Sequence, residues 1–569
     1  QLSHPHLSKR GCALRLLEQD PVVEESMAGQ LTVSAKQQIA QLQKEHDLDL
    51  LLADARFSYV YNECRPTLRQ HGKLSQKRSE QLDNLLLNRW LGLPVFLGMM
   101  YLMFLFAINL GSAFIDFFDI LAGGIFVEGS RVLFEHIGLP EWVIALVSDG
   151  FGTGIQTVAT FIPVIGFLYM FLAALEASGY LARAAFVVDR LMRYLGLPGK
   201  AFVPMLMGFG CSVPAFMATR TLNSERERML TNAMAPFMSC GARLPVYALF
   251  AVAFFPQSGQ NVVFALYLLG ILAAIFTGLV LRNTILPGKS ESSIMEMPDY
   301  ELPRLNYIFL KTWQKLKIFM LGAGKVIVVV VAILSVFNSM GTDGSFGNQN
   351  NGKSLLAVAA QQITPVLSPL GVKQDNWQAT VGIITGIFAK EAVVGTLNTL
   401  YQSDAGSEDD ATEFSLWDKV TEAAATIPAN LADINVKDPA GLDIGDVTDQ
   451  QSAAESQEVD VSIYANMQLH FAGAAGAFAY LLFVLLYMPC SAAMGALFRE
   501  SGRNWAIFVA MWCNLLAFAA STLYFQVTTF SSHPITSLFW ILFYVGGFLL
   551  LTLGLRRRGD ILLNKRVLI

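Results

Sequence analysis

Long apolar stretches separated by short polar connections occupy most of the chain after residue 90. A helix needs about 20 consecutive apolar residues to cross the hydrocarbon core of a bilayer. Eight stretches meet this requirement, at 91–115, 155–177, 230–256, 261–281, 318–338, 470–496, 505–527 and 535–554. The pattern therefore predicts an all-α fold, a polytopic bundle of transmembrane helices.

Arginine and lysine gather at alternate ends of these stretches. Basic residues that flank membrane helices are retained in the cytoplasm. They include Arg89 before the first stretch, Arg183 and Arg190 after the second, Lys311 and Lys315 between the fourth and fifth, Arg499 and Arg503 after the sixth, and residues 556–558 after the eighth. This distribution predicts a multi-pass protein with both chain ends in the cytoplasm.

Two further apolar segments, 198–220 and 377–401, are broken by glycine, proline and polar residues. Non-helical backbone at membrane depth is tolerated only where it lines a protein cavity. Segment 198–220 begins and ends on the cytoplasmic side of the membrane, and segment 377–401 begins and ends on the outer side. We interpret them as two re-entrant gate hairpins in inverted repeats, which is typical of transporters. The alternative is a pair of short, imperfect spans.

The first 80 residues have the composition of a water-soluble region, and apolar residues recur at helical spacing over 34–61. We expect a small cytoplasmic helical domain there. The remaining parts are a first membrane part at 81–400 that holds both hairpins, an acidic periplasmic loop at 402–465, and C-terminal membrane helices at 466–569. The chain begins at Gln1 without an initiator methionine or a signal-peptide pattern, so we expect a fragment whose N-terminal part is missing.

Composition sharpens this division. The chain is 53% hydrophobic and 15% charged, against about 25% charged in soluble proteins. Residues 403–460 carry fifteen acidic and two lysine residues, a charge of −13, so the rest of the chain carries +8 of the total of −5. We expect a disordered outer loop there with one short helix around 413–425. It is either a solvated loop or an electrostatic funnel for cations.

Sulfur atoms mark the candidate chemistry. Cys211, Cys240 and Cys490 each lie beside glycine or proline breaks in apolar segments, and Met238 lies close by. Gly210 and Pro214 permit a tight turn and stop a helix. Thiolate and thioether ligands suit soft or borderline metal ions. We therefore predict metal contact at these sulfur atoms, although a lone buried cysteine is more often a small core residue.

Three charged residues lie within the apolar segments. Glu176 ends the second predicted span, and Lys390 and Glu391 lie in the second hairpin. Charges at that depth cost on the order of 3 kcal/mol each, so they pair with one another or line a polar path. Adjacent residues on a helix do not face each other, and we expect Lys390 and Glu391 to have different partners. A structural role and a direct role in permeation both remain open.

These motifs resemble the FeoB family of bacterial ferrous iron transporters. Residues 208–222 and 236–247 are similar to the first gate and the helix that follows it, residues 389–397 to the second gate, and residues 176–184 and 487–490 also match in order. The resemblance implies GTP-dependent uptake of Fe²⁺ across the inner membrane. It implies that Cys211, Cys240 and Cys490 are the family's membrane cysteines and that Glu176 is its second-span acid.

The resemblance also implies a GTPase domain, followed by a helical domain that inhibits nucleotide dissociation and then the membrane domain. Residues 1–80 are similar to that helical domain. This chain departs from the pattern by lacking the GTPase domain, so it has no catalytic site as given, and GTP and Mg²⁺ enter only through that missing domain. Family partners implied are small cytoplasmic proteins of the FeoA and FeoC types, together with further copies of the chain; nucleic acid is not expected.

Two other functions stay open at this point. Paired re-entrant hairpins also suit transporters of nucleosides or small organic anions, in which helix amino ends face the solute. A membrane-embedded thiol enzyme, or a GTPase whose membrane part only signals, is the third possibility. These functions are distinguished by the gene upstream of Gln1. If it encodes a guanine-nucleotide-binding sequence, the iron transporter is favoured over the nucleoside carrier.

Overall fold

A computed structural model gives the fold of this chain. It describes residues 9–17, 48–67, 76–88, 91–288, 300–343, 352–390, 392–402, 415–432 and 459–567, with isolated positions between these ranges. The chain divides into two units, residues 1–73 and residues 74–569. The regular elements in the described part of each unit are helices, and pairing of extended backbone is limited there to two isolated bridges, Gly341 with Ser354 and Val372 with Phe471. The predicted all-α class is confirmed.

The first unit contains helices α1 (Lys9–Leu17) and α4 (Leu48–Cys64). Cys12, Leu16 and Val23 form a small buried cluster in it. The helical spacing of apolar residues that begins at position 34 thus corresponds in part to α4. Glu391 and most of the acidic segment lie outside the described residues, so the predictions for them are not addressed by the structure.

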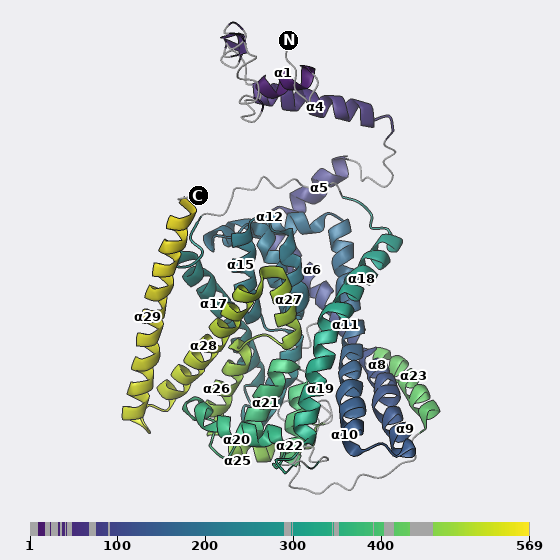
Figure 1. Cartoon of the computed structure of the whole chain (residues 1–569), viewed down its shortest axis with the longest axis vertical. Helices are drawn as coiled ribbons and strands as arrows, with labels where there is room; N and C mark the ends of the chain where they lie inside the picture. Colours follow the sequence, from purple (N-terminus) through teal and green to yellow (C-terminus); the bar gives the residue numbers. More distant parts are fainter. Residues whose placement is uncertain are drawn as a thin grey trace. The chain divides into compact units, whose positions relative to one another are not determined.

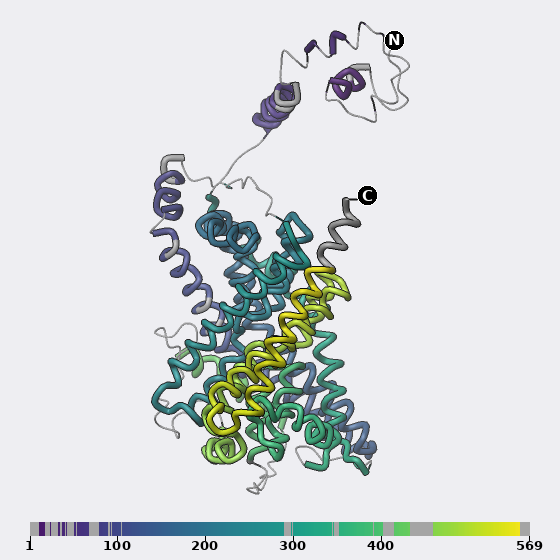
Figure 2. The backbone as a smooth tube through the Cα atoms, turned by 90° about the vertical axis from the view of Figure 1, so that its left-hand side faces the viewer, coloured from purple at the N-terminus to yellow at the C-terminus, as the bar shows by residue number. Residues whose placement is uncertain are grey.

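The second unit is a bundle of long, inclined helices (Figures 1 and 2). Eight helical stretches among its described residues are long and apolar enough to cross a membrane, and each overlaps one predicted span. The stretches are Pro94–Ile137, Glu141–Ala177, Glu225–Phe254, Gly259–Asn283, Leu305–Ser339, Gly473–Ser501, Arg503–Thr528 and Pro534–Arg557. The expectation of a polytopic helical bundle is therefore confirmed.

The amino-terminal part of this unit is longer than hydropathy alone indicates. Its helices are α5 (Gln76–Leu86), α6 (Gly92–Phe104), α7 (Leu110–Ser112), α8 (Ile115–Ala122), α9 (Gly129–Ile137), α10 (Glu141–Ile144) and α11 (Thr153–Ala177), with π-helical segments η1 (Leu105–Asn109), η2 (Gly123–Glu128) and η3 (Ala145–Gly152). Helix α11 packs against α8 and also against α18 (Leu305–Phe319) and α19 (Lys325–Ser339). The π-helical turn η8 (Met320–Gly324) joins α18 to α19.

The acidic segment contains one described helix, α23 (Leu416–Ala432), which begins and ends later than the helix predicted there. It packs along α8. The Asn430 amide donates to Asp116 at 2.6 Å, and Lys419 pairs with Glu128 at 3.4 Å. This part of the segment is thus held on the membrane unit by specific contacts.

A pattern of one helix pair, one broken helix and one continuous helix occurs twice in the second unit. The first set is α13 (Phe202–Gly210) with α14 (Ser212–Ala218), then α15 (Glu225–Met234) with α16 (Leu244–Phe254), then α17 (Gly259–Asn283). The second set is α21 (Trp377–Phe388) with α22 (Ala392–Gln402), then α26 (Gly473–Leu486) with α27 (Ser491–Ser501), then α28 (Arg503–Thr528). Both short pairs pack side by side, at the positions predicted for the hairpins.

The remaining helices are α12 (Tyr180–Tyr194), α20 (Leu355–Leu367), α25 (Ser462–His470) and α29 (Pro534–Val567). One large hydrophobic cluster runs through both sets. Within it the Phe250 ring stacks on Tyr480 at 5.0 Å between centroids and meets Phe471 edge-on at 5.3 Å. Through these ring contacts α16 of the first set packs against α26 of the second, so the two broken helices share one core.

A polar junction joins three segments at one end of the second unit. The Arg183 side chain of α12 is 3% exposed and donates from Nε to Asp83 Oδ1 of α5 at 2.6 Å. Its Nη1 donates to the Pro298 carbonyl at 2.8 Å, and its guanidinium lies 3.6 Å from the centre of the Tyr300 ring. Tyr300 also donates to Asp83 at 2.8 Å. Burial alone would raise the pKa of Asp83, but hydrogen bonds from Arg183 and Tyr300 outweigh it and lower that pKa.

This junction predicts a pH-dependent stability. A carboxylate with a lowered folded-state pKa stabilises the fold above its unfolded pKa, near 4, and loses that contribution as the pH falls through its folded pKa. We expect Asp83→Asn to cost about 1–3 kcal/mol at pH 7 and to flatten the acid limb of a plot of melting temperature against pH. Thermal unfolding in detergent between pH 7 and 3 measures this. Glu80→Gln, an exposed position on the same helix, is the control, and an unchanged acid limb in Asp83→Asn would contradict the assignment.

Candidate functional site

The first helix break lies between α13 and α14. Gly210 ends α13, and Cys211 has extended backbone, with φ −155° and ψ 133°, before α14 begins at Ser212. Pro214 lies in the first turn of α14, where its missing N–H would have no intrahelical partner in any case. A helix break was predicted here, but with Pro214 as the residue that stops the helix; in the structure α13 already ends at Gly210, and Pro214 lies within the first turn of the next helix.

The second break interrupts the helical stretch from Glu225 to Phe254. A 3₁₀ turn, η6 (Ala235–Phe237), is followed by extended backbone at Met238 and Cys240, and a second 3₁₀ turn, η7 (Gly241–Arg243), leads into α16. The prolines at 236 and 245 explain the interruption, because proline lacks the N–H that an uninterrupted α-helix requires.

The second set of helices has matching breaks. Between α21 and α22, Ala389 is extended and Lys390 follows it. Between α26 and α27, the backbone is extended from Tyr487, with ψ 169°, to Cys490, with ψ 160°. Cys211, Cys240 and Cys490 thus each immediately precede the first turn of a helix. The sequence had indicated only that each lies beside a break.

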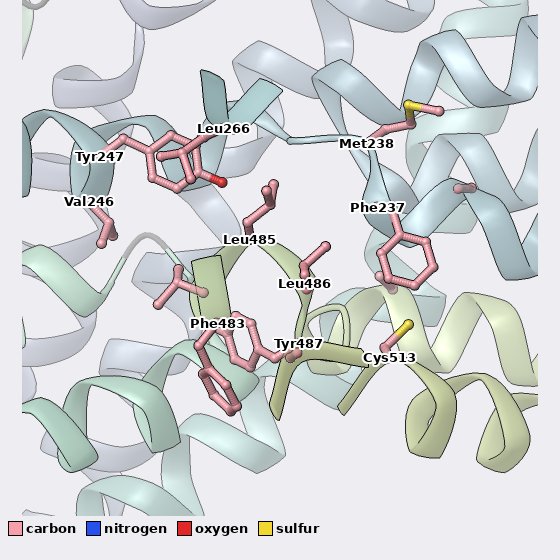
Figure 3. Packing of buried hydrophobic residues seen from close by; sticks show 14 of the residues in the cluster. Phe237, Met238, Val246, Tyr247, Leu266, Phe483, Leu485, Leu486, Tyr487 and Cys513 are labelled. Carbon is pink, nitrogen blue, oxygen red and sulfur yellow. The ribbon is translucent and has the colours of Figure 1, made fainter. Parts of the chain in front are cut away.

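The four breaks meet in the interior. A Cβ on Gly208 would lie 3.0 Å from Cβ of Met238, which brings the first break against the second. The Ser491 hydroxyl donates to the Phe388 carbonyl at 3.0 Å, which joins the fourth break to the third. Figure 3 shows Phe237 and Met238 of the second break in one packed region with Leu486 and Tyr487 of the fourth. Carbonyl and N–H groups freed by these breaks therefore converge.

The four breaks also share an electrostatic environment. The Lys390 side chain is 4% exposed and Arg243 is 1% exposed. Lys390 lies within electrostatic range of Arg243, Cys240 and Cys490, and Arg243 within range of Cys240. The arrangement places thiols, helix ends and the side chains of Lys390 and Arg243 in one largely buried region.

The predicted metal ligands are distributed unevenly around this region. Cys211, Cys240 and Cys490 are partly buried, and Met238 is 4% exposed beside Gly208. In the part of the chain that the structure describes, no group of three or more His, Cys, Asp or Glu residues is close enough to hold a metal ion by itself. Assignment of these sulfur atoms as ligands stays a prediction.

Glu176 lies elsewhere. Its carboxylate accepts from Lys311 Nζ at 2.8 Å and from Lys315 Nζ at 3.4 Å, between the end of α11 and the middle of α18, and its side chain is 44% exposed. Two lysines thus balance this carboxylate at the surface. Its role as a metal ligand also stays a prediction, as does the gate role of Lys390.

Several residues of the site were missed by sequence reasoning. Arg243 and Tyr487 lie at its centre, and Cys513 of α28 is fully buried within range of Arg243. The sequence signal that could have identified Arg243 is a charged residue between two prolines in an apolar stretch. The contribution of Tyr487 and Cys513 depends on contacts between distant segments, which no local pattern reveals.

A cavity of about 400 Å³ lies beside the site. It is lined by α14, the end of α18, η8, α27 and the start of α28. At one end the Arg220 guanidinium contacts Glu500 through Nε at 2.7 and 2.9 Å and through a terminal nitrogen at 2.5 Å. The Glu500 side chain is 5% exposed and that of Arg220 is 56% exposed. The ion pair joins the residues just after α14 to the end of α27, the two helices that begin after Cys211 and Cys490.

Comparison with known proteins identifies the family. Three family models match: "Nucleoside recognition" at 158–254 and 320–504, "Ferrous iron transport protein B C terminus" at 263–315, and "FeoB cytosolic helical domain" at 1–69. An Fe(2+) transporter FeoB of Salmonella paratyphi A is 43% identical over 559 residues, which cover 98% of this chain and 71% of that protein. The chain belongs to the FeoB family. The resemblance inferred from the gate motifs is thus confirmed.

Other FeoB relatives agree. The Fe(2+) transporter FeoB of Legionella pneumophila strain Philadelphia 1 is 48% identical over 502 residues, 88% of this chain and 66% of the relative, and that of strain Lens is 48% identical over 509 residues. The chain spans about two thirds of the length of these FeoB proteins. No solved structure matches it.

Proposed function

We propose that this chain forms the membrane path of a ferrous iron transporter in the bacterial inner membrane. The observation that carries the proposal is the convergence of four helix breaks, three of them bearing a cysteine, in the interior of an apolar bundle. Broken backbone within a membrane bundle is expected where it lines a solute path. The printed names of the relatives, Fe(2+) transporter FeoB, support iron as the solute.

In this proposal Fe²⁺ enters from the periplasm and passes between the α13–α14 and α21–α22 pairs, which are the re-entrant gates. Cys211, Cys240, Cys490 and Met238 hold it transiently. Fe²⁺ is low in the affinity order of first-row metals, and transport needs binding weak enough for release. The ion leaves through the cavity that Arg220 and Glu500 close, towards a cytoplasm that also holds both chain ends.

GTP dependence is part of the proposal. We infer that a GTPase domain, which the family resemblance places before the helical unit, drives the gates through residues 1–73. GTP and Mg²⁺ would then act outside the residues described here. Small FeoA-type and FeoC-type proteins and further copies of the chain are the partners proposed. The relatives favour this function over transport of nucleosides or organic anions.

The direct test is uptake of radioactive Fe²⁺ by cells that lack other iron importers. These cells express the full-length protein that contains this chain. We expect Cys211→Ser, Cys240→Ser and Cys490→Ser each to lower uptake about tenfold or more, because a hydroxyl is a poorer ligand for this ion than a thiol. Cys64→Ser, at an exposed cysteine of α4, is the matched control. Protein amounts in the membrane are compared by immunoblot.

Unchanged uptake in all three variants would remove the thiol path. Uptake of labelled nucleoside without uptake of iron would support the rival carrier. Iron uptake that persists when GTP hydrolysis is blocked would separate the iron path from the proposed GTP drive.

A further inference from the structure

The cavity beside the four breaks has walls of small and apolar side chains. Its volume is about 400 Å³, and around it α27 packs against α14, η8, α19 and α28. The small residues on its walls are Gly322, Ala323, Gly495, Ala496 and Ala506. For an added Cβ on Gly495, the nearest atom of another helix is a methyl carbon of Val326, 3.9 Å away, so the space beside α27 is open. Cavities of about 300–1,000 Å³ with largely apolar walls are typical ligand sites.

The cavity opens on the lipid-facing side of the bundle. Four large apolar residues of its lining keep between 37% and 50% of their surface exposed, and these are Ile318, Val326, Phe498 and Ile507. They lie in three of the helical stretches that are long and apolar enough to cross a membrane. Apolar side chains exposed on such helices contact hydrocarbon. Lipid chains therefore reach the mouth of the cavity.

Arg499 brings a positive charge to this mouth. It is an exposed residue in the last turn of α27, and it lines the cavity. Its guanidinium lies against the π-helical turn η8, where a Cβ on Gly322 would collide with Nη1. The charged residues on the described lining are Arg220, Arg499 and Glu500, and Glu500 is paired with Arg220. Two cations and one anion leave the lining a net charge of +1, so the guanidinium of Arg499 is left for an anion.

We propose that this cavity binds an anionic phospholipid, with one acyl chain between α14 and α27 and the phosphate against Arg499. Basic pockets between membrane helices bind anionic head groups in this way, and the guanidinium fork matches the oxygens of a phosphate. The charge decides the occupant. A zwitterionic lipid or an apolar helix of a second copy would cover the walls but would bring no net negative charge to Arg499.

The bound lipid also regulates the exit of the ion, and this part rests on the proposed function. The proposed route for Fe²⁺ leaves through the same cavity. An acyl chain inside it fills that route, so the lipid has to withdraw before the ion passes. The lipid thus favours the closed state, since it binds the closed cavity in preference to an open one.

Lipid binding to the purified full-length protein tests the site. The protein is freed of native lipid in detergent and titrated with dioleoylphosphatidylglycerol, and bound lipid is counted by native mass spectrometry. Dioleoylphosphatidylcholine, which has the same chains and no net charge, is titrated in parallel. Glycerol phosphate, which has the phosphate without the chains, is added as a competitor.

We expect the first molecule of phosphatidylglycerol to bind about tenfold more tightly than phosphatidylcholine, because its phosphate charge is not balanced within the lipid. Arg499→Gln is expected to weaken this binding about tenfold, since a hydrogen bond between charged groups is lost. Arg499→Lys keeps the charge and is expected to keep most of the affinity. Gly495→Leu displaces at least two methylene groups of the chain and is expected to weaken binding about tenfold or more.

Arg503→Gln and Gly547→Leu are the matched controls, and both are expected to bind phosphatidylglycerol like the wild type. Arg503 is exposed at the start of α28, and Gly547 is exposed on α29, where an added Cβ has nothing within 4 Å. Equal binding of the two lipids, displacement of the lipid by glycerol phosphate, or wild-type binding in Arg499→Gln would each overturn the proposal. Because Arg499 is exposed, its variant decides the head-group contact even if Gly495→Leu misfolds.

Iron entry into vesicles tests the regulatory part. Wild type and Arg499→Gln are compared in vesicles of phosphatidylcholine alone and in vesicles with an equal share of phosphatidylglycerol, and Fe²⁺ entry is followed with an enclosed iron-quenched dye. We expect Arg499→Gln to pass iron several-fold faster than the wild type only where phosphatidylglycerol is present. Equal rates there, with weakened lipid binding, overturn the regulatory part. If no vesicle takes up iron, the proposed function fails, while the titration still decides whether the lipid site exists.

Discussion

Glu500→Arg is expected to abolish most iron uptake and to lower the amount of folded protein. The native carboxylate is 5% exposed and receives its charge partner, Arg220, from the neighbouring helix pair. Because Arg220 is more than half exposed, loss of the pair is expected to cost about 1–3 kcal/mol, chiefly from the buried Glu500 position. The new arginine would also be next to Arg499 in the sequence and beside Arg220, which contacts Glu500 directly, so three like charges would replace a compensated pair.

A charge swap gives the decisive comparison. In Glu500→Arg combined with Arg220→Glu, opposite charges again face each other, and we expect at least half of the lost thermal stability to return. Arg503→Gln, an exposed position at the start of α28, is the control for loss of one basic charge. Melting temperature in detergent and radioactive iron uptake are measured on all variants. A single Glu500→Arg variant with wild-type values of both would contradict the closing role of the ion pair.

Gly270→Ala is expected to destabilise the chain by about 1–3 kcal/mol, as overpacking of a core does. Gly270 lies in α17, and a Cβ there would lie 2.6 Å from the carbonyl oxygen of Phe237, the last residue before the extended part of the second break. Backbone is on the opposing side, so the clash is relieved only by moving α17 or the break. We therefore expect iron uptake to fall together with stability.

Gly166→Ala is the matched control because it makes the same change in α11, where the added Cβ has nothing within 4 Å. Alanine is favoured over glycine inside a helix by roughly 0.5–1 kcal/mol, so this variant is expected to be slightly more stable than the wild type. Unfolding temperature and inactivation half-life at a fixed temperature report both effects. Equal shifts for the two alanine variants would show that the contact at Phe237 is not tight.

Hydropathy located all eight long helices because each depends on one local property, the run of apolar residues. The helix pairs α13–α14 and α21–α22 were also located from the sequence, since glycine, proline and polar residues interrupt the runs there. Their re-entrant course in a bilayer stays a prediction. The sequence placed the three cysteines beside breaks but did not indicate that each precedes the start of a helix.

The helices between 116 and 152 escaped prediction for a physical reason. Their acidic residues depress the average hydropathy, but in the fold these carboxylates have partners: Asp119 accepts from Gln156 at 2.9 Å, and Asp149 pairs with Arg131 at 3.8 Å. A hydropathy average over a sequence window includes the charged residue but not the distant residue that pairs with it in the fold. Polar contacts of this kind, between residues 18 to 37 positions apart, carry no periodic signal.

The composition of the site was predictable only in part for the same reason. Arg220 and Glu500 are 280 positions apart, and Glu176 meets Lys311 across 135. From the sequence, Glu176 and a cysteine are equally plausible occupants of a metal path. Only the three-dimensional arrangement separates the carboxylate balanced by lysines from the thiols near the four breaks.

The π-helical turn η8 fixes the rotational phase between the two halves of the Leu305–Ser339 stretch. On the α19 side, Val328 and Ala332 form the face against which Gly154 and Gly150 pack, with added Cβ atoms at 2.9 and 3.2 Å from their Cα atoms. Each residue of an α-helix turns the chain by about 100°. Shortening η8 by one residue would therefore swing this face away from the glycines while leaving α18 in place, so the length of the turn, more than the identity of its residues, keeps the α19 interface in register.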